Sequence, residues 1–131
     1  MISETTTTVL IDSNIWIEYF IKGKKDEKCA PLIERATIEH NITPSIILFE
    51  VFKKLNQQKG IEVAIKSVSY ICNQTTIIDM DQIVAVKAAK ISNEHQLHMA
   101  DAMIKATAEI NHAKLFTMDT HFTGLENVEI I

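Results

Sequence analysis

The sequence predicts an α/β fold in which helices cover both faces of a short parallel sheet. Short apolar runs typical of buried strands alternate along the 131 residues with segments whose apolar residues recur at helical spacing. Strands that alternate with helices form βαβ units, whose strands pair in parallel. The chain has only three glycines and two prolines, so its elements are expected to be helix-rich and joined by short loops.

The first third of the chain is expected to hold two strands and two helices. The apolar run at residues 9–11 predicts a buried strand that ends at Asp12, and a short helix is expected over 14–20. A lysine-rich loop follows. A second helix is then expected over 29–38 and a short strand over 41–43.

The middle third is expected to hold two helices and a strand. Pro44 suits the first turn of a helix, where its missing N–H needs no partner. This helix is expected over 45–58 and to stop at Gly60, because glycine readily ends a helix. A further helix is predicted over 61–72, and the β-branched run at 75–78 predicts a strand.

The last third is expected to add two helices and two strands. Asp81 is a good cap for a helix, and the stripe expected to face the core is Ile83, Val84, Val86, Ala88 and Ile91. Another helix is expected to begin near Asp101 and to run to about residue 110. Strands are predicted over 114–117 and 128–131.

Length and composition indicate a single domain over residues 1–131. No apolar run approaches the length of a membrane span, and the start MISETTTTVLID is polar where a signal peptide would be apolar, so a cytoplasmic location without membrane contact is expected. Cys29 and Cys72 lie far apart and outside metal-type spacing. Reduced, partly buried thiols are therefore expected.

The net charge of −4 is unusual for a protein that binds the phosphates of a nucleic acid. The positive residues nevertheless form two groups. One group lies in a predicted loop and consists of Lys22, Lys24, Lys25 and Lys28. The other follows one helix and consists of Lys53, Lys54 and Lys59. Both groups are equally consistent with contacts to the phosphates of a nucleic acid and with a solvated surface. Arg35 is the only arginine, so bidentate readout of bases is not expected to dominate.

Four acids occupy positions that the predicted fold would bring to one edge of the sheet. Asp12 and Asp119 each follow a predicted strand, and ligands of parallel sheets bind at the carboxyl ends of the strands. Asp101 begins a helix. Glu50 lies in an otherwise apolar stretch, where an unpaired carboxylate is costly. Convergent carboxylates repel one another unless a cation neutralises them, and oxygen ligands without Cys or His select Mg²⁺ or Mn²⁺.

Each acid also has a purely structural explanation. Asp12 and Asp101 are suitable helix caps, and Asp119 suits a turn. Glu50 has Lys54 four residues later, in the favourable order for an ion pair along a helix. Taken together, the four acids favour a common site over four separate coincidences.

Other patterns are weaker. His95 and His98 are three residues apart, but no third ligand stands at zinc spacing, so a surface pair is expected. Ser13 has no neighbouring base that would make it a nucleophile. The phenylalanines and Trp16 lie in apolar stripes, and the core is the favoured interpretation over a base-stacking surface.

Four segments of the chain resemble the PIN-domain family, particularly the VapC-type toxins of bacterial and archaeal toxin–antitoxin pairs. The segments occur in the family's order and extend over almost the whole chain: residues 9–14 (VLIDSN), 43–51 (TPSIILFEV), 97–104 (LHMADAMI) and 115–122 (LFTMDTHF). Any one segment is a weak pattern, but four in order are fairly specific.

The resemblance places the family's conserved groups on particular residues. Its four acids fall on Asp12, Glu50, Asp101 and Asp119. The small hydroxyl after the first acid falls on Ser13, and the threonine before the last acid falls on Thr117. Some relatives have a further acid near the fourth, where this chain has His121, and this departure leaves the occupancy of a second metal position open.

The resemblance implies a three-layer α/β/α sandwich and an endoribonuclease that uses Mg²⁺ or Mn²⁺. Asp12, Asp101 and Asp119 would be metal ligands, and Glu50 would complete the ligand shell or orient the attacking water. Three neighbours would hold the carboxylates or the phosphate, namely Ser13, Asn14 and Thr117. Family members typically form homodimers, and the toxins are held inactive by a small antitoxin whose tail enters the acidic groove.

Three other functions are compatible with parts of the sequence. Phosphotransfer on Asp12, as in haloacid dehalogenase-type phosphatases, needs an acid two residues later, where this chain has Asn14. A catalytically silent PIN fold that acts as a binding module is disfavoured, because an unused acidic site would gain stability by losing its acids. A housekeeping RNA-processing nuclease remains open as an alternative to a toxin.

Overall fold

The computed structural model describes residues 7–131, and its centre is one sheet of five parallel strands. The strands are β1 (Thr8–Ile11), β2 (Asn41–Pro44), β3 (Thr76–Ile78), β4 (Ala113–Thr117) and β5 (Val128–Ile130). Their order across the sheet is β3-β2-β1-β4-β5, which puts β1 in the middle. The predicted α/β class and parallel sheet are confirmed. The expectation of a polar start rests partly on residues 1–6, which lie outside the described part of the chain.

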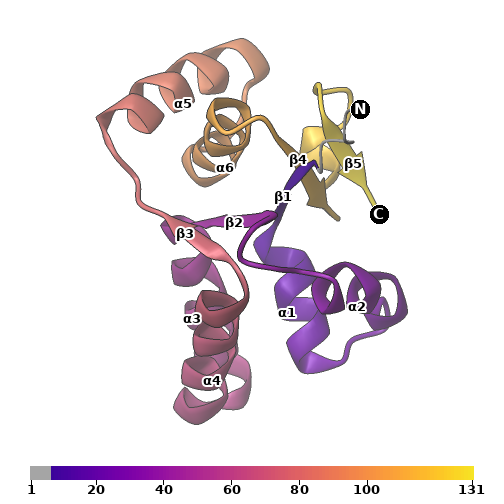
Figure 1. Cartoon of the computed structure of the whole chain (residues 1–131). Helices are drawn as coiled ribbons and strands as arrows, with labels where there is room; N and C mark the ends of the chain where they lie inside the picture. Colours follow the sequence, from indigo (N-terminus) through magenta and orange to yellow (C-terminus); the bar gives the residue numbers. More distant parts are fainter. Residues whose placement is uncertain (1–6) are drawn as a thin grey trace.

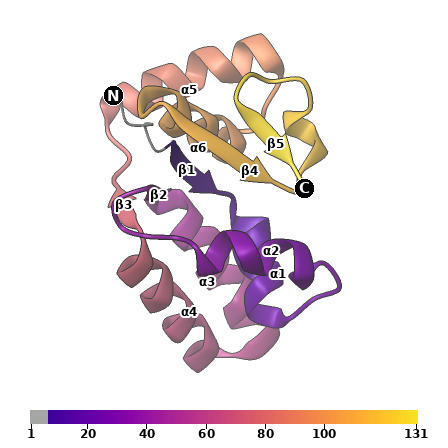
Figure 2. The ribbon, with the colours of Figure 1, turned by 45° about the vertical axis from the view of Figure 1, so that its right-hand side comes forward.

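Helices lie on both sides of this sheet. They are α1 (Ser13–Ile21), α2 (Asp26–Glu34), α3 (Ser45–Lys59), α4 (Ile61–Gln74), α5 (Gln82–His95) and α6 (Met99–Ile110), with a short 3₁₀ helix, η1 (Thr120–Phe122). In both ribbon views α1–α4 lie below the sheet and α5 and α6 lie above it (Figures 1 and 2). The result is the three-layer α/β/α sandwich that the resemblance implied.

The core forms where the middle strands meet the helices. Leu10, Ile11 and Leu115 on β1 and β4 are fully or almost fully buried, as expected for strands covered on both faces. On the α1 side, the buried Trp16 ring stacks on Phe20 with a centroid distance of 6.0 Å. The burial of these side chains is the reason that short apolar runs located the two middle strands in the sequence.

Two predicted helices have shifted bounds in the structure. The helix expected over 29–38 is α2, which begins at Asp26 and ends at Glu34, because acids in the first turn favour the amino end of a helix. After α2 the chain turns, and the Asn41 side chain accepts a hydrogen bond from the Thr37 amide at 3.0 Å. The helix expected to begin near Asp101 begins two residues earlier, at Met99. Pro44 closes β2 and lies just before α3 rather than in its first turn.

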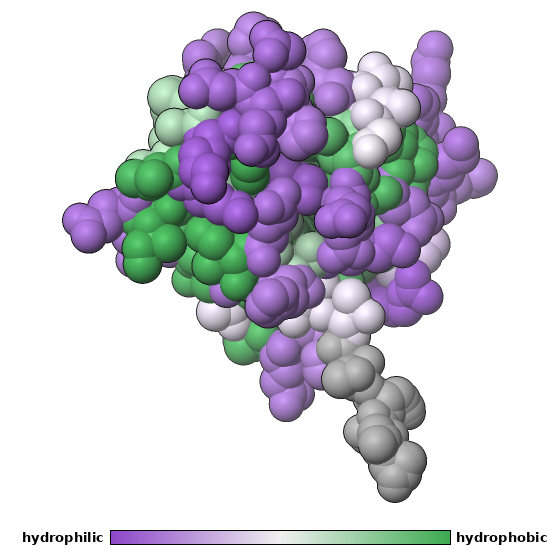
Figure 3. All heavy atoms as spheres, turned by 90° about the horizontal axis from the view of Figure 1, so that it is seen from above, coloured by the Kyte–Doolittle hydropathy of each residue, from purple (hydrophilic) through white to green (hydrophobic). Residues whose placement is uncertain are grey.

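The apolar stripe predicted for α5 is only partly buried. Val84, Ala88 and Ile91 are buried as expected, but Ile83 and Val86 are 64% and 65% exposed. Helix α5 packs mainly against α6, and Ile83 and Val86 lie on the flank that stays open to solvent. Seen from above, the molecule carries an apolar patch on the side where α5 begins (Figure 3).

No helix within residues 7–131 is both long and apolar enough to cross a membrane. Both cysteines are free thiols, but they differ in burial: Cys29 is buried and Cys72 is exposed.

Candidate active site

Asp12 ends the central strand and begins the first helix. Its Oδ1 accepts a hydrogen bond from the Ser13 amide at 2.7 Å, so the residue does cap α1. Its Oδ2 accepts a second hydrogen bond from the Thr117 hydroxyl, also at 2.7 Å. The side chain is only 3% exposed. The cap and the site are therefore compatible explanations, since each oxygen has a separate partner.

Thr117 joins the first acid to the last. The register of β1 and β4, which pairs Ile11 with Phe116, brings the fully buried Thr117 next to Asp12. While the Thr117 hydroxyl donates to Asp12, its oxygen accepts from the Asp119 amide at 2.9 Å.

Asn14 fixes the same strand end from α1. Its Nδ2 donates to the Thr117 hydroxyl oxygen at 3.3 Å, and its Oδ1 accepts from the Met118 amide at 3.2 Å. The side chains of Asn14 on α1 and Thr117 on β4 thus hold the backbone amides of Met118 and Asp119.

Glu50 reaches the site from the second turn of α3. Its Oε1 accepts a hydrogen bond from the Ser13 hydroxyl at 2.8 Å. Within the described residues Glu50 forms no ion pair with Lys54, the partner that a purely structural explanation would require. The hydrogen bond from Ser13 to Glu50 connects α1 to α3, just as the hydrogen bond from Thr117 to Asp12 connects β4 to the end of β1.

Asp101 and Asp119 come together with a histidine. Asp101 is the third residue of α6, whose cap position is His98, so Asp101 is not the helix cap. Asp119 accepts from the His121 amide at 2.8 Å, and its Oδ1 lies 3.1 Å from His121 Nδ1. One ligand atom each from Asp101, Asp119 and His121 lie within 4.8 Å of one another, a spacing compatible with a shared metal ion.

Burial and mutual repulsion disfavour the charged forms of three of the acids. Burial raises the pKa of Asp12 to about 7, against the hydrogen bonds from Thr117 and Ser13, and the charges of Glu50 and Asp101 raise it further. Burial also raises the pKa of Glu50, with a smaller effect from Asp101. The pKa of Asp101 is raised by burial and by the charge of Asp119. A bound cation would relieve this cost, so the donor set fits a divalent metal ion.

The structure separates the two lysine groups. Helix α1 begins beside Asp12 and spans nine residues, so its far end, where Lys22 and its neighbours lie, is about 13 Å along the helix from the acids. In contrast, Lys53 and Lys54 line an open hollow together with Ser13 and Glu50. Both groups are exposed.

Sequence reasoning overlooked some of the side chains at the site. The resemblance marks His121 only as a departure from an acid, whereas its place in 115–122 (LFTMDTHF), two residues after Asp119, is a signal for a role at the site. His98, expected to pair with His95 at the surface, instead has its ring 6.4 Å from that of His121. The exposure of Phe49 had no sequence signal, because the residue lies in an apolar run.

A parallel α/β/α sandwich with acids gathered at the carboxyl edge of its sheet defines a PIN-like protein. The PIN domain family matches residues 9–127, and the chain therefore belongs to this family. No match is found among the curated proteins.

Solved structures resemble this chain over nearly its full length. A toxin–antitoxin complex from Klebsiella pneumoniae has a chain with 26% identity and a TM-score of 0.75, covering 93% of this chain and 96% of that chain. A VapC toxin from Mycobacterium tuberculosis that cleaves the sarcin–ricin loop has 14% identity and a TM-score of 0.79, covering 94% and 98%. A DNA-bound VapBC complex from Salmonella typhimurium has 17% identity and a TM-score of 0.73, covering 95% and 97%. The last two support the fold alone.

Proposed function

We propose that this protein is an endoribonuclease dependent on Mg²⁺ or Mn²⁺ and the toxin of a type II toxin–antitoxin pair. The observation that carries the proposal is the junction of β1, β4, α3 and α6, where Asp12, Asp119, Glu50 and Asp101 meet in a PIN domain. Similarity to a chain of the toxin–antitoxin complex from Klebsiella pneumoniae favours the toxin role over housekeeping RNA processing.

In this proposal Asp12, Asp101 and Asp119 hold the metal, with Glu50 completing the shell or orienting the attacking water. His121 is an additional candidate ligand, because its ring nitrogen shares the space between Asp101 and Asp119. An imidazole ligand suits transition metals better than Mg²⁺, which favours Mn²⁺ here. When bound, the cation would stabilise the charge that develops on the phosphodiester and lower the pKa of a water.

The chain's own groups set the geometry around that centre. The Ser13 and Thr117 hydroxyls each donate to a carboxylate oxygen, so Glu50 and Asp12 are held in fixed orientations before substrate arrives. Asn14 holds the end of β4, which fixes the position of Asp119.

The partners follow from the same proposal. RNA is the substrate. Exposed lysines contact its phosphates, including Lys22, Lys24, Lys25 and Lys28. A small antitoxin covers the acidic groove, and the protein forms a homodimer. Exposed apolar patches often mark surfaces that contact another protein. The exposed apolar side chains on α4 and α5 therefore favour protein partners, and they are Ile61, Ile65, Ile83 and Val86. We also propose a cytoplasmic location, where RNA and a newly made antitoxin are both present.

Cleavage of RNA by the purified protein tests the proposal. Activity should require Mg²⁺ or Mn²⁺ and stop in EDTA, and Asp119→Asn should lower it by a factor of about 100 or more. Asparagine caps a helix as well as aspartate does, so η1 is retained. Asp81→Asn is the matched control, because Asp81 caps α5 through the Val84 amide away from the site. Cleavage that persists in excess chelator would contradict the metal mechanism.

The toxin role has its own test. Co-expression with the product of a short reading frame beside the gene should yield a stable complex with suppressed RNA cleavage. A protein that cleaves RNA but is neither bound nor inhibited by its genetic neighbour would be a housekeeping nuclease instead.

A further inference from the structure

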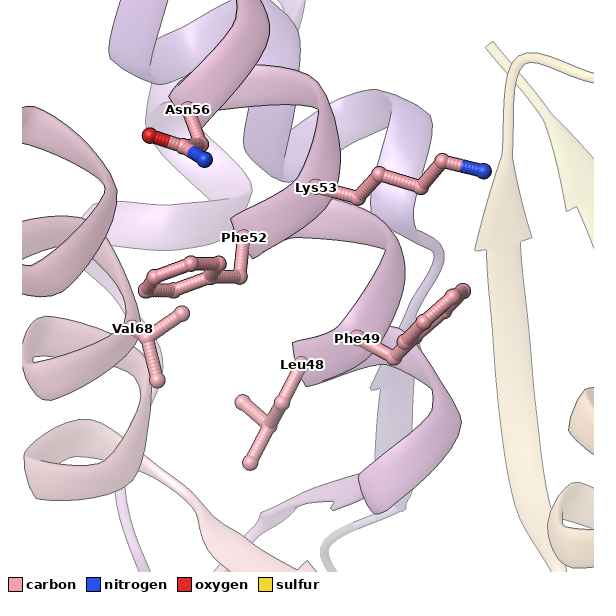
Figure 4. A pocket seen from close by; sticks show the side chains of 6 residues that line it. All are labelled: Leu48, Phe49, Phe52, Lys53, Asn56 and Val68. Atoms are coloured by element: carbon pink, nitrogen blue, oxygen red, sulfur yellow. The ribbon is translucent and has the colours of Figure 1, made fainter. Parts of the chain in front are cut away.

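Phe49 is an exposed aromatic residue directly before Glu50 on α3. Its side chain is 60% exposed, whereas Phe52, on the next turn, packs partly against the core. Figure 4 shows that Phe52 points toward Val68 of α4 while Phe49 points away from it. The expectation that the phenylalanines serve the core is wrong at this position.

The ring of Phe49 and the acidic site share an open hollow of about 320 Å³. The residues that line it come from α1 and α3: Ser13, Ile17, Phe49, Glu50, Lys53, Lys54 and Gln57. Ser13 donates to Glu50 in the wall of this hollow, so its inner end is part of the site itself. The volume lies at the small end of the range for ligand pockets, about 300–1,000 Å³.

One ammonium group stands beside the ring, and a second lysine lines the same hollow. Lys53 Nζ lies 5.8 Å from the centroid of the Phe49 ring, and Lys54 is the next residue of α3. Both lysines are exposed, and neither forms an ion pair within the described residues. They give this face of α3 a positive charge next to a carboxylate cluster that would otherwise repel a polyanion.

On the basis of the proposed nuclease function, we propose that Phe49 and Lys53 form a seat for one nucleotide of single-stranded RNA beside the scissile phosphodiester. The base stacks on the exposed ring, and Lys53 and Lys54 contact the adjoining phosphates. Aromatic faces bind bases without sequence preference, and lysines bind phosphates as point charges. A nucleotide matches both features of this face, because its base is apolar enough to cover the ring and its phosphates match the two ammonium groups.

Binding in EDTA tests the seat without cleavage. The probe is a short single-stranded RNA in which 2-aminopurine, whose fluorescence falls on stacking, replaces adenine. Phe49→Leu keeps an apolar side chain but removes the ring, and should weaken binding by roughly 5- to 100-fold and abolish the quenching. Phe49→Trp should bind at least as tightly as the wild type. Lys53→Gln should reduce the slope of log affinity against log salt by about 0.7.

Lys90→Gln on α5 is the control for charge, because it removes an exposed lysine on the opposite side of the sheet and should change nothing. Equal RNA binding by the wild type, Phe49→Leu and Phe49→Trp would overturn the seat. If Phe49→Leu leaves RNA binding intact but weakens self-association in analytical ultracentrifugation, the ring serves a protein interface instead. Cleavage assays in Mn²⁺ distinguish the failure of the two proposals. If the wild type cleaves RNA and Phe49→Leu binds and cleaves RNA equally well, only the seat is refuted. If the wild type binds RNA through Phe49 but does not cleave it, only the nuclease is refuted.

Discussion

Replacing Asp12 with asparagine should stabilise the metal-free protein above neutral pH. Burial raises the pKa of this carboxyl from 3.8 to about 7. The folded state therefore binds more protons than the unfolded state between these values, and stability is lost as pH rises from about 4 through 7. Each tenfold change in acidity corresponds to about 1.4 kcal/mol, so the charged form costs about 4 kcal/mol at pH 8.

Asparagine removes that charge and keeps the helix cap, but it gives up part of the present hydrogen bonding. The Thr117 hydroxyl donates to Asp12 Oδ2, and an amide nitrogen in that place cannot accept this bond, which costs about 1 kcal/mol. The net gain expected at pH 8 is about 3 kcal/mol, or roughly 10 °C in melting temperature. Near pH 4 the gain should vanish, because the folded Asp12 carboxyl is then neutral and the unfolded one is only partly ionised, so its charge no longer outweighs the lost hydrogen bond.

Thermal unfolding in EDTA across pH 4–8 measures this difference. Subtracting the wild-type curve from that of Asp12→Asn removes the contributions of acids that do not interact with Asp12, and leaves those of Asp12 and of its coupling to Glu50 and Asp101. Asp81→Asn should follow the wild type throughout. Added Mn²⁺ should raise the melting temperature of the wild type and raise that of Asp12→Asn far less, since ligand binding stabilises only where the site survives. The reasoning is refuted if Asp12→Asn melts at or below the wild type at pH 8 in EDTA.

Two further predictions concern the hydrogen bonds and the lysines. Thr117→Val keeps the buried shape but leaves Asp12 Oδ2 and the Asp119 amide without their partner, so it should destabilise the protein by about 1–3 kcal/mol in urea titrations and lower cleavage roughly 10- to 100-fold. A variant as stable and as active as the wild type would show that Thr117 only fills space. Changing the loop lysines to glutamine together should flatten the salt dependence of RNA binding by roughly one slope unit per lost phosphate contact, and an unchanged slope would assign them to solvated surface. These lysines are Lys22, Lys24, Lys25 and Lys28.

The helix boundaries illustrate the limit of local patterns. The end of α3 at Gly60 was predictable from the sequence, because glycine readily ends a helix. In the structure Gly60 has a φ of +96°, a conformation that glycine adopts without strain. The start of α2 was missed by three residues, because Asp26 and Glu27 carry no apolar signal, although they suit the first turn of a helix. Periodicity thus locates the apolar part of an element better than its polar ends.

The sequence by itself determined the fold class and which acids stand at the ends of its elements. The apolar runs Val9–Ile11 and Leu115–Phe116 marked β1 and β4, because strands in the middle of a sheet covered by helices bury most of their side chains, and Asp12 and Asp119 were then found just after them. Only the tertiary structure decided which neighbours these acids acquire. The hydrogen bonds of Ser13 to Glu50 and of Thr117 to Asp12 join residues 37 and 105 positions apart, and no local pattern encodes such contacts. The exposure of Phe49 was decided in the same way, because an apolar run on a helix shows which side chains avoid water but not which of its flanks a neighbouring element will cover.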